Sequence, residues 1–347
     1  MEFNRAQNPV NSVPMRRFGE VMLGRVKEPA DMRAFLPDSC LEADTVIVKP
    51  NWYSLHPGNF TDAETLRTLL EALDSQAVVI EGYTLERHDG SMAVRVDGEK
   101  VNWRWIMRHP DWGWVREGGR WQEIRRQDDW FLEEYGFRDL FDELGAEYVN
   151  VTEETWATRN VDPDTVKEIV ERRFRPAFTE KLYGFLPRKL HDLKGSPLIS
   201  LGKVKGIGGT YPSLTLKNLF GLVPDPLRPW WHGPRDSRLS ASIVDIAKVY
   251  ASFFQLHGIC EAINTLTVSN TEGEVKTPWG NYDVVRDLGV VASGPDLVTL
   301  DAILCGLIRV DPEKVGYLQK GEEEFGAYDR ALVQEARSVS SDWFPVE

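Results

Sequence analysis

A strand, a helix and a second strand follow one another near the start of the chain, and this pattern restricts the fold more than any other feature. The β-branched run at 44–49 predicts a buried strand. A capping box formed by Thr61 and Glu64 predicts the start of a helix over 61–73, and 77–81 predicts the second strand. Such a unit joins parallel strands by a right-handed crossover, so we expect a parallel sheet.

The same alternation continues to the end of the chain. Apolar residues at helical spacing predict a helix over 130–144, followed by a strand at 147–151. Further strands are expected at 197–201, 263–268 and 288–292, and further helices at 213–221, 240–254, 297–308 and 312–325. The predicted fold class is therefore α/β, with a mostly parallel sheet and helices on both of its faces.

The domain prediction has three parts. Residues 1–43 are expected to form an extended lead-in, and 44–347 a single α/β domain. Residues 82–130, rich in tryptophan and arginine, break the alternation and predict an inserted cap of short antiparallel strands and turns. Aromatic and basic residues in alternation also occur where nucleic acids or sugars bind. Acidic residues offset the basic charge of this segment, so a packed cap over a site is the preferred interpretation.

Composition and charge exclude several classes of partner. The 347 residues carry 41 Lys and Arg against 54 Asp and Glu, a formal charge of −13, which disfavours duplex nucleic acid and anionic membranes. No apolar run approaches the ~20 residues of a membrane span, and the N-terminus lacks a signal-peptide profile. Three widely spaced cysteines indicate a reducing compartment, and no iron–sulfur cluster is expected. We therefore expect a cytoplasmic protein, and an oligomer is compatible with the sequence.

The first candidate site is the segment that links the strand at 197–201 to the helix at 213–221. Its candidate residues, with those of the following helix, are Lys203, Lys205, Gly206, Gly208, Gly209, Lys217 and Asn218. In a parallel sheet, ligands bind beyond the carboxyl ends of strands, where glycines and a helix N-terminus suit an anion. The spacing matches neither a Walker A loop nor a dinucleotide fingerprint. The alternative is a tight turn with surface lysines.

Two further candidates lie elsewhere in the chain. The rigid, proline-bounded stretch 228–235 contains His232, which can exchange a proton near neutral pH, and Arg235, which can hold an anion. The alternative is a loop packed on its tryptophans, with an ordinary histidine. At the end of the first strand, Lys49 and Asn51 face the expected crevice, with Glu81 at the end of the next strand. The alternative there is a surface ion pair. The other histidines show no metal-ligand spacing, so no metal is indicated.

The chain resembles the DUF362 family, a group named for its lack of an assigned function. The resemblance rests on the segments at 48–52, 61–62, 199–205 and, most specifically, Leu216-Lys217-Asn218-Leu219-Phe220-Gly221-Leu222-Val223-Pro224, with His232, 243–246 and 292–302 in family order. It covers about 44–326, without a counterpart for 82–130. The chain departs from the family at a histidine after the Lys-x-Lys pair, at a late glycine–proline turn, and in lacking cysteine-rich ferredoxin modules. The cationic residues remain.

Together these residues predict an enzyme that acts on a small carboxylate- or phosphate-bearing metabolite by acid–base chemistry, as an isomerase, lyase or transferase. Crowded cations lower each other's pKa, which makes a lysine usable as a base. The expected catalytic residues are Lys203, Lys217 and His232, and the expected ligand-binding residues are Lys49, Asn51, Lys205, Gly206, Gly208, Gly209, Asn218 and Arg235. The cofactor is left unassigned. The alternatives are a non-catalytic protein that holds a ligand or cofactor and a redox protein.

Overall fold

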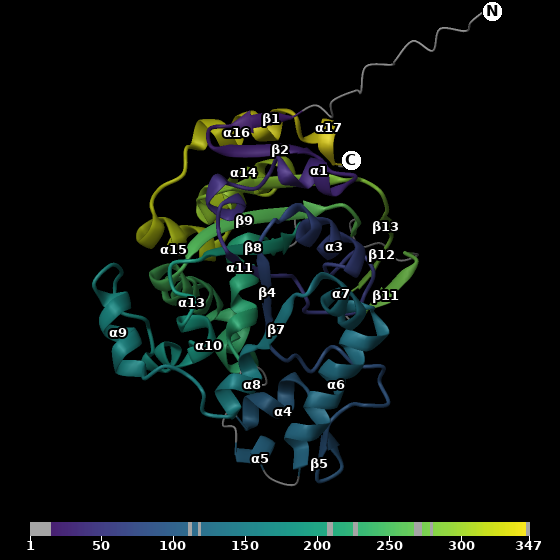
Figure 1. Ribbon diagram of the computed structural model, residues 1–347, viewed down its shortest axis with the longest axis vertical. Coiled ribbons are helices and arrows are strands. Elements are labelled where there is room, and N and C mark those ends of the chain that lie inside the picture. Colours follow the sequence, from purple (N-terminus) through teal and green to yellow (C-terminus); the bar gives the residue numbers. More distant parts are fainter. Residues whose placement is uncertain are drawn as a thin grey trace, which may run out of the picture.

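The computed structural model describes residues 15–109, 113–116, 119–206, 211–224, 228–266, 273–277 and 280–344. Its centre is an eight-stranded mixed sheet in the order β1-β2-β14-β9-β8-β3-β4-β7 (Figure 1). The five strands from β9 to β7 are parallel, and the others are antiparallel. The strands are β1 (Arg16–Phe18), β2 (Val21–Arg25), β3 (Thr45–Lys49), β4 (Gln76–Glu81), β7 (Glu147–Asn150), β8 (Pro197–Lys203), β9 (Gln255–Ala262) and β14 (Val290–Gly294).

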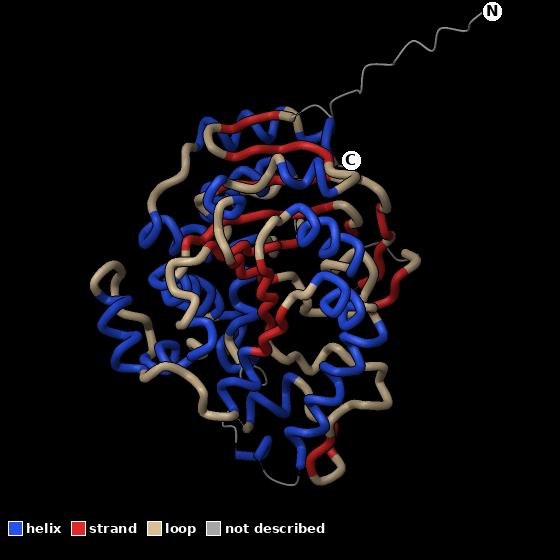
Figure 2. The backbone as a smooth tube through the Cα atoms, viewed as in Figure 1, coloured by secondary structure: helices blue, strands red, loops and turns tan. Residues whose placement is uncertain are grey.

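Both faces of the sheet are covered, as the alternation of side chains in β3 shows. Ile47 packs into the core on one face, whereas Val46 and Val48 pack into the core on the other. The first core is shared with α9 (Pro163–Glu171), α13 (Leu239–Phe253) and α14 (Leu297–Leu307), and the second with α1 (Pro29–Arg33), α3 (Ala63–Ala72), α6 (Arg120–Glu134) and α7 (Phe137–Leu144). Figure 2 shows the strands between helices. The predicted α/β class is confirmed.

The remaining elements are short. The helices are α2 (Asp38–Leu41), α4 (Trp103–Arg108), α5 (Gly113–Arg116), α8 (Val151–Trp156), α10 (Arg188–His191), α11 (Thr215–Asn218), α12 (Arg228–His232), α15 (Gly316–Phe325), α16 (Arg330–Ser338) and α17 (Ser340–Trp343). The 3₁₀ turns are η2 (Glu180–Phe185), η3 (Leu219–Leu222), η4 (Pro234–Asp236) and η5 (Pro312–Lys314). Three two-stranded antiparallel sheets pair β5 (Arg95–Val96) with β6 (Glu99–Lys100), β10 (Thr265–Leu266) with β13 (Val284–Val285), and β11 (Val275–Thr277) with β12 (Gly280–Tyr282).

Two local predictions need correction. Helix α3 is capped by Asp62, whose carboxylate accepts from the Thr65 amide at 2.8 Å, and not by Thr61. The Thr61 hydroxyl instead accepts from the Asn51 amide at 3.1 Å, so it ties the loop after β3 to the start of α3. The strand expected at 263–268 is not a strand of the central sheet: β9 ends at Ala262, and of the predicted range Thr265–Leu266 forms β10, which pairs with β13. Residues 267–268 lie outside the described residues.

The predicted extended lead-in over 1–43 does not hold where the structure describes it. Residues 16–25 form the β1–β2 hairpin, and β2 pairs antiparallel with β14 along residues 290–293. Strand β1 is three residues long with two arginines, and β2 contains a glycine, so neither has the apolar pattern that identifies a strand from sequence. These strands extend the sheet on the side away from β7.

The cap, residues 82–130, is mainly helical and not made of antiparallel strands as predicted. It contains the β5–β6 hairpin, α4, α5 and most of α6, and lies at the bottom of Figure 1. Asn102 caps α4 by accepting from the Trp105 amide at 3.1 Å. Trp105 and Trp114 fill a separate apolar core, so these tryptophans stabilise the cap. Trp112 lies outside the described residues.

Two carboxylates hold the cap against the sheet domain: Asp128 of α6, which accepts from the Tyr148 hydroxyl at 2.9 Å and the Asn150 side-chain amide at 3.0 Å on β7, and Glu153. Glu153, on α8, accepts hydrogen bonds from the Tyr83 hydroxyl at 2.8 Å and from the Trp121 indole at 2.7 Å, and it forms an ion pair with Arg125. Trp121 and Arg125 both lie on α6, and Tyr83 follows β4. Glu153 therefore holds the long helix of the cap beside the carboxyl ends of β4 and β7.

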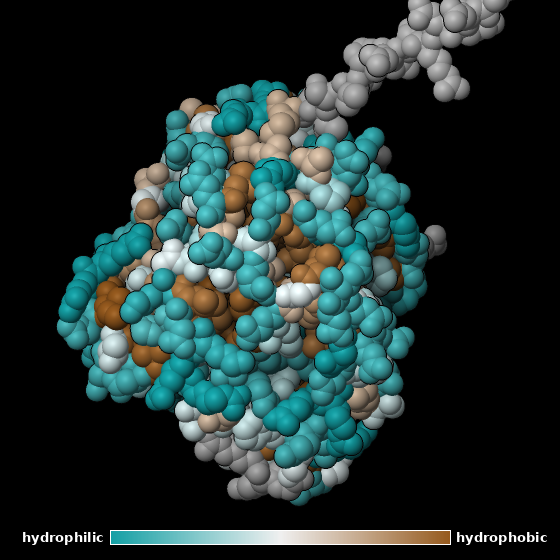
Figure 3. All heavy atoms as spheres, viewed as in Figure 1, coloured by the Kyte–Doolittle hydropathy of each residue, from teal (hydrophilic) through white to brown (hydrophobic). Residues whose placement is uncertain are grey.

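The outer surface is largely hydrophilic on the face shown in Figure 3, where apolar residues gather in patches near the middle. Among the residues that the structure describes, no helix is both long enough and apolar enough to cross a bilayer.

Replacing Glu153 by alanine should loosen the cap without unfolding the sheet. Losing its hydrogen bonds to Tyr83 and α6 should reduce the opening free energy of α6 by about 2 kcal/mol, which is about 30-fold faster amide exchange. Hydrogen–deuterium exchange of α6, with β3 and β8 as internal references, checks this. Glu134→Ala, at an exposed position on α6 itself, is the control and should leave the exchange of α6 unchanged. Equal exchange of α6 in both variants would contradict the role of Glu153.

Candidate functional site

A cavity of about 450 Å³ opens at the carboxyl ends of β3, β4 and β8. These are neighbouring parallel strands, so their carboxyl ends meet at one edge of the sheet. The cap helix α4 and the segments α11 and α12 supply the other walls. Five Lys and Arg residues line the cavity, against two carboxylates, in a chain whose formal charge is −13. These residues are Lys49, Lys100, Lys205, Lys217 and Arg228, with Glu81 and Glu86.

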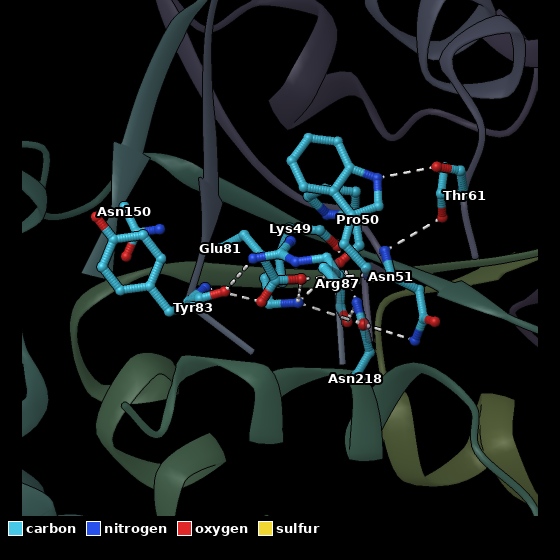
Figure 4. A network of polar contacts seen from close by, with 12 residues as sticks. Lys49, Pro50, Asn51, Thr61, Glu81, Tyr83, Arg87, Asn150 and Asn218 are labelled. Atoms are coloured by element: carbon cyan, nitrogen blue, oxygen red, sulfur yellow. Dashed lines mark hydrogen bonds and ion pairs between the residues drawn. The ribbon is translucent and has the colours of Figure 1, made fainter. Parts of the chain in front are cut away.

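One cation of the cavity is neutralised by a buried carboxylate. The Lys49 ammonium lies 2.8 Å from Glu81 Oε2 and also donates to the Pro50 carbonyl at 2.7 Å (Figure 4). Both side chains are at most 2% exposed. Burial lowers the pKa of Lys49, and the Glu81 charge opposes that shift. Glu81 accepts further from the Gly82 amide at 2.8 Å and the Trp52 amide at 3.3 Å, so the pair is hydrogen-bonded into the backbone of both strand ends.

The structure explains why position 221 of the family-like stretch 216–224 is a glycine. A Cβ atom at this position would lie 2.8 Å from both the Lys49 Nζ and Glu81 Oε1 atoms. A Cβ atom at Gly82 would in turn lie 2.7 Å from the Gly221 carbonyl oxygen. The ion pair therefore lies against a backbone that has no side chain, and only glycine allows this approach.

Two asparagines orient the lysines. Asn218 donates to the Lys49 carbonyl at 2.8 Å and accepts from the Asn51 amide group at 3.0 Å (Figure 4). The Asn51 side-chain oxygen accepts from the Lys205 ammonium at 2.7 Å. This chain of hydrogen bonds links the ends of β3 and β8 to α11. The predicted residues Lys49, Asn51, Lys205, Lys217 and Asn218 are thus brought together around one cavity.

Lys205 and Lys217 have pKa values near neutrality. Burial, then the charges of Lys203 and Lys217, lower the pKa of Lys205 to about 7. Burial lowers the pKa of Lys217 to about 8, against the opposing charge of Asp236. Among the described residues, no carboxylate lies within ion-pair distance of either ammonium group, although Lys49 and Lys203 each have one. Each of these two lysines can therefore gain or release a proton close to pH 7.

Arg228, at the start of the candidate stretch 228–235, lines the cavity, although Arg235 was the arginine expected to bind the ligand. The Arg228 side chain is 7% exposed, and one guanidinium nitrogen donates to the Tyr83 carbonyl. Its Nε atom is buried and has no hydrogen-bond partner among the described residues. A buried, permanently charged group with a free donor favours an anion beside it. The sequence offered Arg228 and Arg235 at the two ends of the same stretch, and no sequence signal distinguished them.

His232 lies at the cavity wall with one nitrogen engaged. Its Nδ1 atom is 2.8 Å from Asp236 Oδ1, and burial lowers the pKa of the imidazole. A neutral ring beside a carboxylate carries its proton on Nδ1, which leaves Nε2 as a proton acceptor. The ring is flanked edge-to-face by Trp103 of the cap at 4.7 Å and by Phe220 at 5.2 Å between centroids. His232 is therefore positioned as a neutral base or acceptor.

Asp301, on α14, fixes the start of α11 and so the position of Lys217 and Asn218. Its carboxylate accepts from the Thr215 amide at 2.9 Å, the Thr215 hydroxyl at 2.5 Å and the Leu216 amide at 2.9 Å. Helix α11 has only four residues, and Asp301 already takes its first amides. The predicted contribution of a helix N-terminus to anion binding is therefore not supported. The positive charge comes from side chains.

The structure does not bring several predicted residues into the cavity. Lys203 is fully buried and paired with Glu261 at 2.8 Å, outside the cavity lining. Arg235 is exposed on η4 and also lies outside the lining. Gly206 follows Lys205 with a φ of +106°, a backbone conformation that favours glycine, but does not line the cavity. Gly208 and Gly209 lie outside the described residues.

The arrangement as a whole defines an α/β protein with a cationic cavity at the carboxyl ends of parallel strands. In the described part of the chain, no three His, Cys, Asp or Glu side chains converge as metal ligands. The three cysteines are free and buried.

The chain belongs to the DUF362 family: residues 46–306 match the model described as "Domain of unknown function (DUF362)". It is also 25% identical over 121 residues to the thylakoid-associated protein sll1697 of Synechocystis sp. (strain ATCC 27184 / PCC 6803 / Kazusa). That match spans 34% of this chain and 34% of the relative, about a third of each protein. No solved structure matches the chain.

Gly221→Ala should disturb the cavity through the ion pair. The added methyl group would overlap Lys49 and Glu81, and such overpacking costs about 1–3 kcal/mol. Urea unfolding measures the loss. Gly184→Ala is the matched control, because its Cβ would meet its nearest neighbour at an ordinary 3.7 Å. Equal stability of the two variants would contradict the close approach at Gly221.

Sulfate binding should weaken as pH rises from 6 to 9. Lys205 and Lys217, with pKa values of about 7 and 8, are charged at the lower end of this range and lose their protons across it. Hydrogen bonds to charged groups contribute about 1.5–3 kcal/mol, so we expect at least a tenfold fall in affinity by calorimetry. Sulfate does not titrate in this range. Lys205→Arg should make the profile shallower, because arginine stays charged and, of the two positions, Lys217 alone still titrates in this range. A flat wild-type profile would contradict these pKa shifts.

Proposed function

We propose that this protein is an enzyme that binds a small anionic metabolite in the cavity and moves a proton on it. The observation that carries the proposal is the set of three cations, Lys205, Lys217 and Arg228, that face one cavity without a paired carboxylate among the described residues. Buried positive charge without a partner is costly, and a carboxylate or phosphate group on a ligand would supply the missing charge.

The pKa values of Lys205 and Lys217 and the free Nε2 atom of His232 support proton transfer in this proposal. A lysine whose pKa is near 7 is partly neutral at physiological pH, and general acid–base catalysis is most effective when the pKa of the group is near the working pH. Lys205 and Lys217 can serve as base and acid, and the Nε2 atom of His232 offers a second acceptor. Removal of a proton next to the bound acidic group would leave a negative charge that the adjacent cations stabilise. Isomerisation, elimination and group transfer all use such a step.

The residue roles differ from those expected from sequence. Lys205 replaces Lys203 as a catalytic lysine in this proposal, because Lys203 is closed off by Glu261. Arg228 replaces Arg235 as the anion-binding arginine. Lys49, Asn51 and Asn218 position the other groups, since their contacts are with one another and with the backbone. We further propose a cytoplasmic location, which suits three free, buried cysteines.

Solvent-hydrogen exchange tests the proposal without a known substrate. Panels of carboxylated and phosphorylated metabolites are incubated with the protein in D₂O, and mass spectrometry detects deuterium on carbon. We expect exchange into at least one compound, reduced by a factor of about 10² or more in Lys205→Met or Lys217→Met. Lys320→Met, at an exposed position on α15, is the control and should retain full exchange.

Two results would contradict the proposed proton transfer. If native mass spectrometry finds a retained anionic ligand that exchanges no hydrogen and is recovered unchanged, the protein is a non-catalytic binding protein. If Lys205→Met and Lys217→Met both exchange deuterium at the wild-type rate, the proposed proton transfer is wrong.

A further inference from the structure

Exposed aromatic side chains gather at the cavity. Five large apolar or aromatic side chains are strongly exposed among the described residues, and three of them line this cavity: Tyr53, Trp103 and Tyr211, at 42%, 42% and 45% exposure. They come from three separate parts of the chain, namely the loop after β3, the cap helix α4 and the loop before α11. Exposed rings are costly in water, and their convergence on one concave site indicates an apolar ligand surface.

Trp103 differs from the buried tryptophans of the cap. Trp105 and Trp114 are at most 8% exposed and pack in the core of the cap, whereas Trp103 faces the cavity and contacts His232. Trp103 lies at the first position of α4, where Asn102 fixes the start of the helix. The cap therefore has enough tryptophan to stabilise itself and presents one further indole to the cavity.

The aromatic surface directly adjoins the cations. The Lys217 ammonium lies 4.8 Å from the centroid of the Tyr211 ring, and Trp103 and Phe220 flank His232. A ligand that touches both surfaces therefore carries its acidic group and its apolar body close together in one small molecule. The volume of the cavity is consistent with such a ligand. Its 450 Å³ corresponds to the liquid volume of on the order of 15 water molecules, far more than a simple inorganic anion needs.

We infer that the ligand is an amphipathic anion, in which a carboxylate or phosphate held by Lys205, Lys217 and Arg228 is joined to a flat, apolar or aromatic body that lies against Trp103. This inference rests on the proposed anion site and adds the chemical class of the rest of the molecule. The cap then contributes to specificity by supplying Trp103, and the sheet domain supplies the charge.

Matched pairs of ligands test the inference by calorimetry at pH 6.5. Phenyl phosphate is compared with methyl phosphate, and benzoate with acetate, so that the two pairs also show whether the acidic group is a phosphate or a carboxylate. In the preferred pair, the phenyl compound should bind at least tenfold more tightly, since contact with an aromatic side chain contributes on this scale. Trp103→Ala should remove most of that gain, and Trp103→Phe should keep part of it.

Two control variants separate the ring from the charge. Phe178→Ala removes a side chain that is equally exposed, at 42%, but lies outside the cavity, and it should change no affinity. Lys217→Met should weaken both members of the preferred pair.

The outcomes distinguish this inference from the proposal on which it depends. Equal binding of both members of each pair, or a phenyl preference that survives in Trp103→Ala, overturns the inference and leaves the anion site standing. Failure of all four compounds to bind overturns both.

Discussion

The parallel arrangement of β8, β3 and β4 is the constraint on which the site depends. Because the three strands end at the same edge of the sheet, Lys49, Glu81 and the segment with Lys205 are forced into one small volume. Among the described residues, Lys49 is the one cation of the cavity lining that forms an ion pair with a buried carboxylate, that of Glu81. A buried pair of this kind contributes little net stability but is strongly destabilising when one partner is removed. The Lys49–Glu81 pair therefore has a fixed position, and the other cations of the cavity, which are not paired with a carboxylate among the described residues, lie around it.

The unpaired charge links stability to ligand binding. Burial and mutual repulsion lower the pKa of Lys205, and burial lowers that of Lys217, so part of the cost is met by releasing protons. Arg228 cannot release a proton, and its buried Nε atom has no partner among the described residues. An anion in the cavity would satisfy all three groups, and the folded state would be stabilised by its binding.

The fold class and six of the residues that line the cavity could be predicted from the sequence, because they follow from local patterns. The β-branched run of β3 and the leucines of α3 report two-sided burial, and strand ends in a parallel sheet point to one crevice. Lys49 and Asn51 were found at a strand end, Lys205, Lys217 and Asn218 in the stretch after the strand at 197–201, and His232 in the proline-bounded stretch 228–235. The family-like stretch 216–224 contained a further signal, Gly221, whose cause became clear only with the position of the ion pair.

Other features depend on tertiary contacts that no spacing reports. Lys203 and Lys205 are two residues apart, but among the described residues Lys203 pairs with a carboxylate, because β9 places Glu261 beside it, and Lys205 does not. Strand β2 pairs with the edge of β14 and β1 pairs with β2, and both strands are too short for their own sequences to show this. The cap was predicted as strands because aromatic and charged residues alternate there, whereas burial of Trp105 and Trp114 in helices satisfies the same composition.

Anion binding by Lys205, Lys217 and Arg228 is tested most directly by a crystal structure of the protein soaked with selenate. The anomalous signal of selenium locates the bound anion. We predict a selenium peak in the cavity, with the selenate oxygens in contact with the ammonium groups of Lys205 and Lys217 and the guanidinium of Arg228. An empty cavity at a selenate concentration that gives peaks elsewhere, with these side chains turned to solvent or paired with carboxylates, would contradict it.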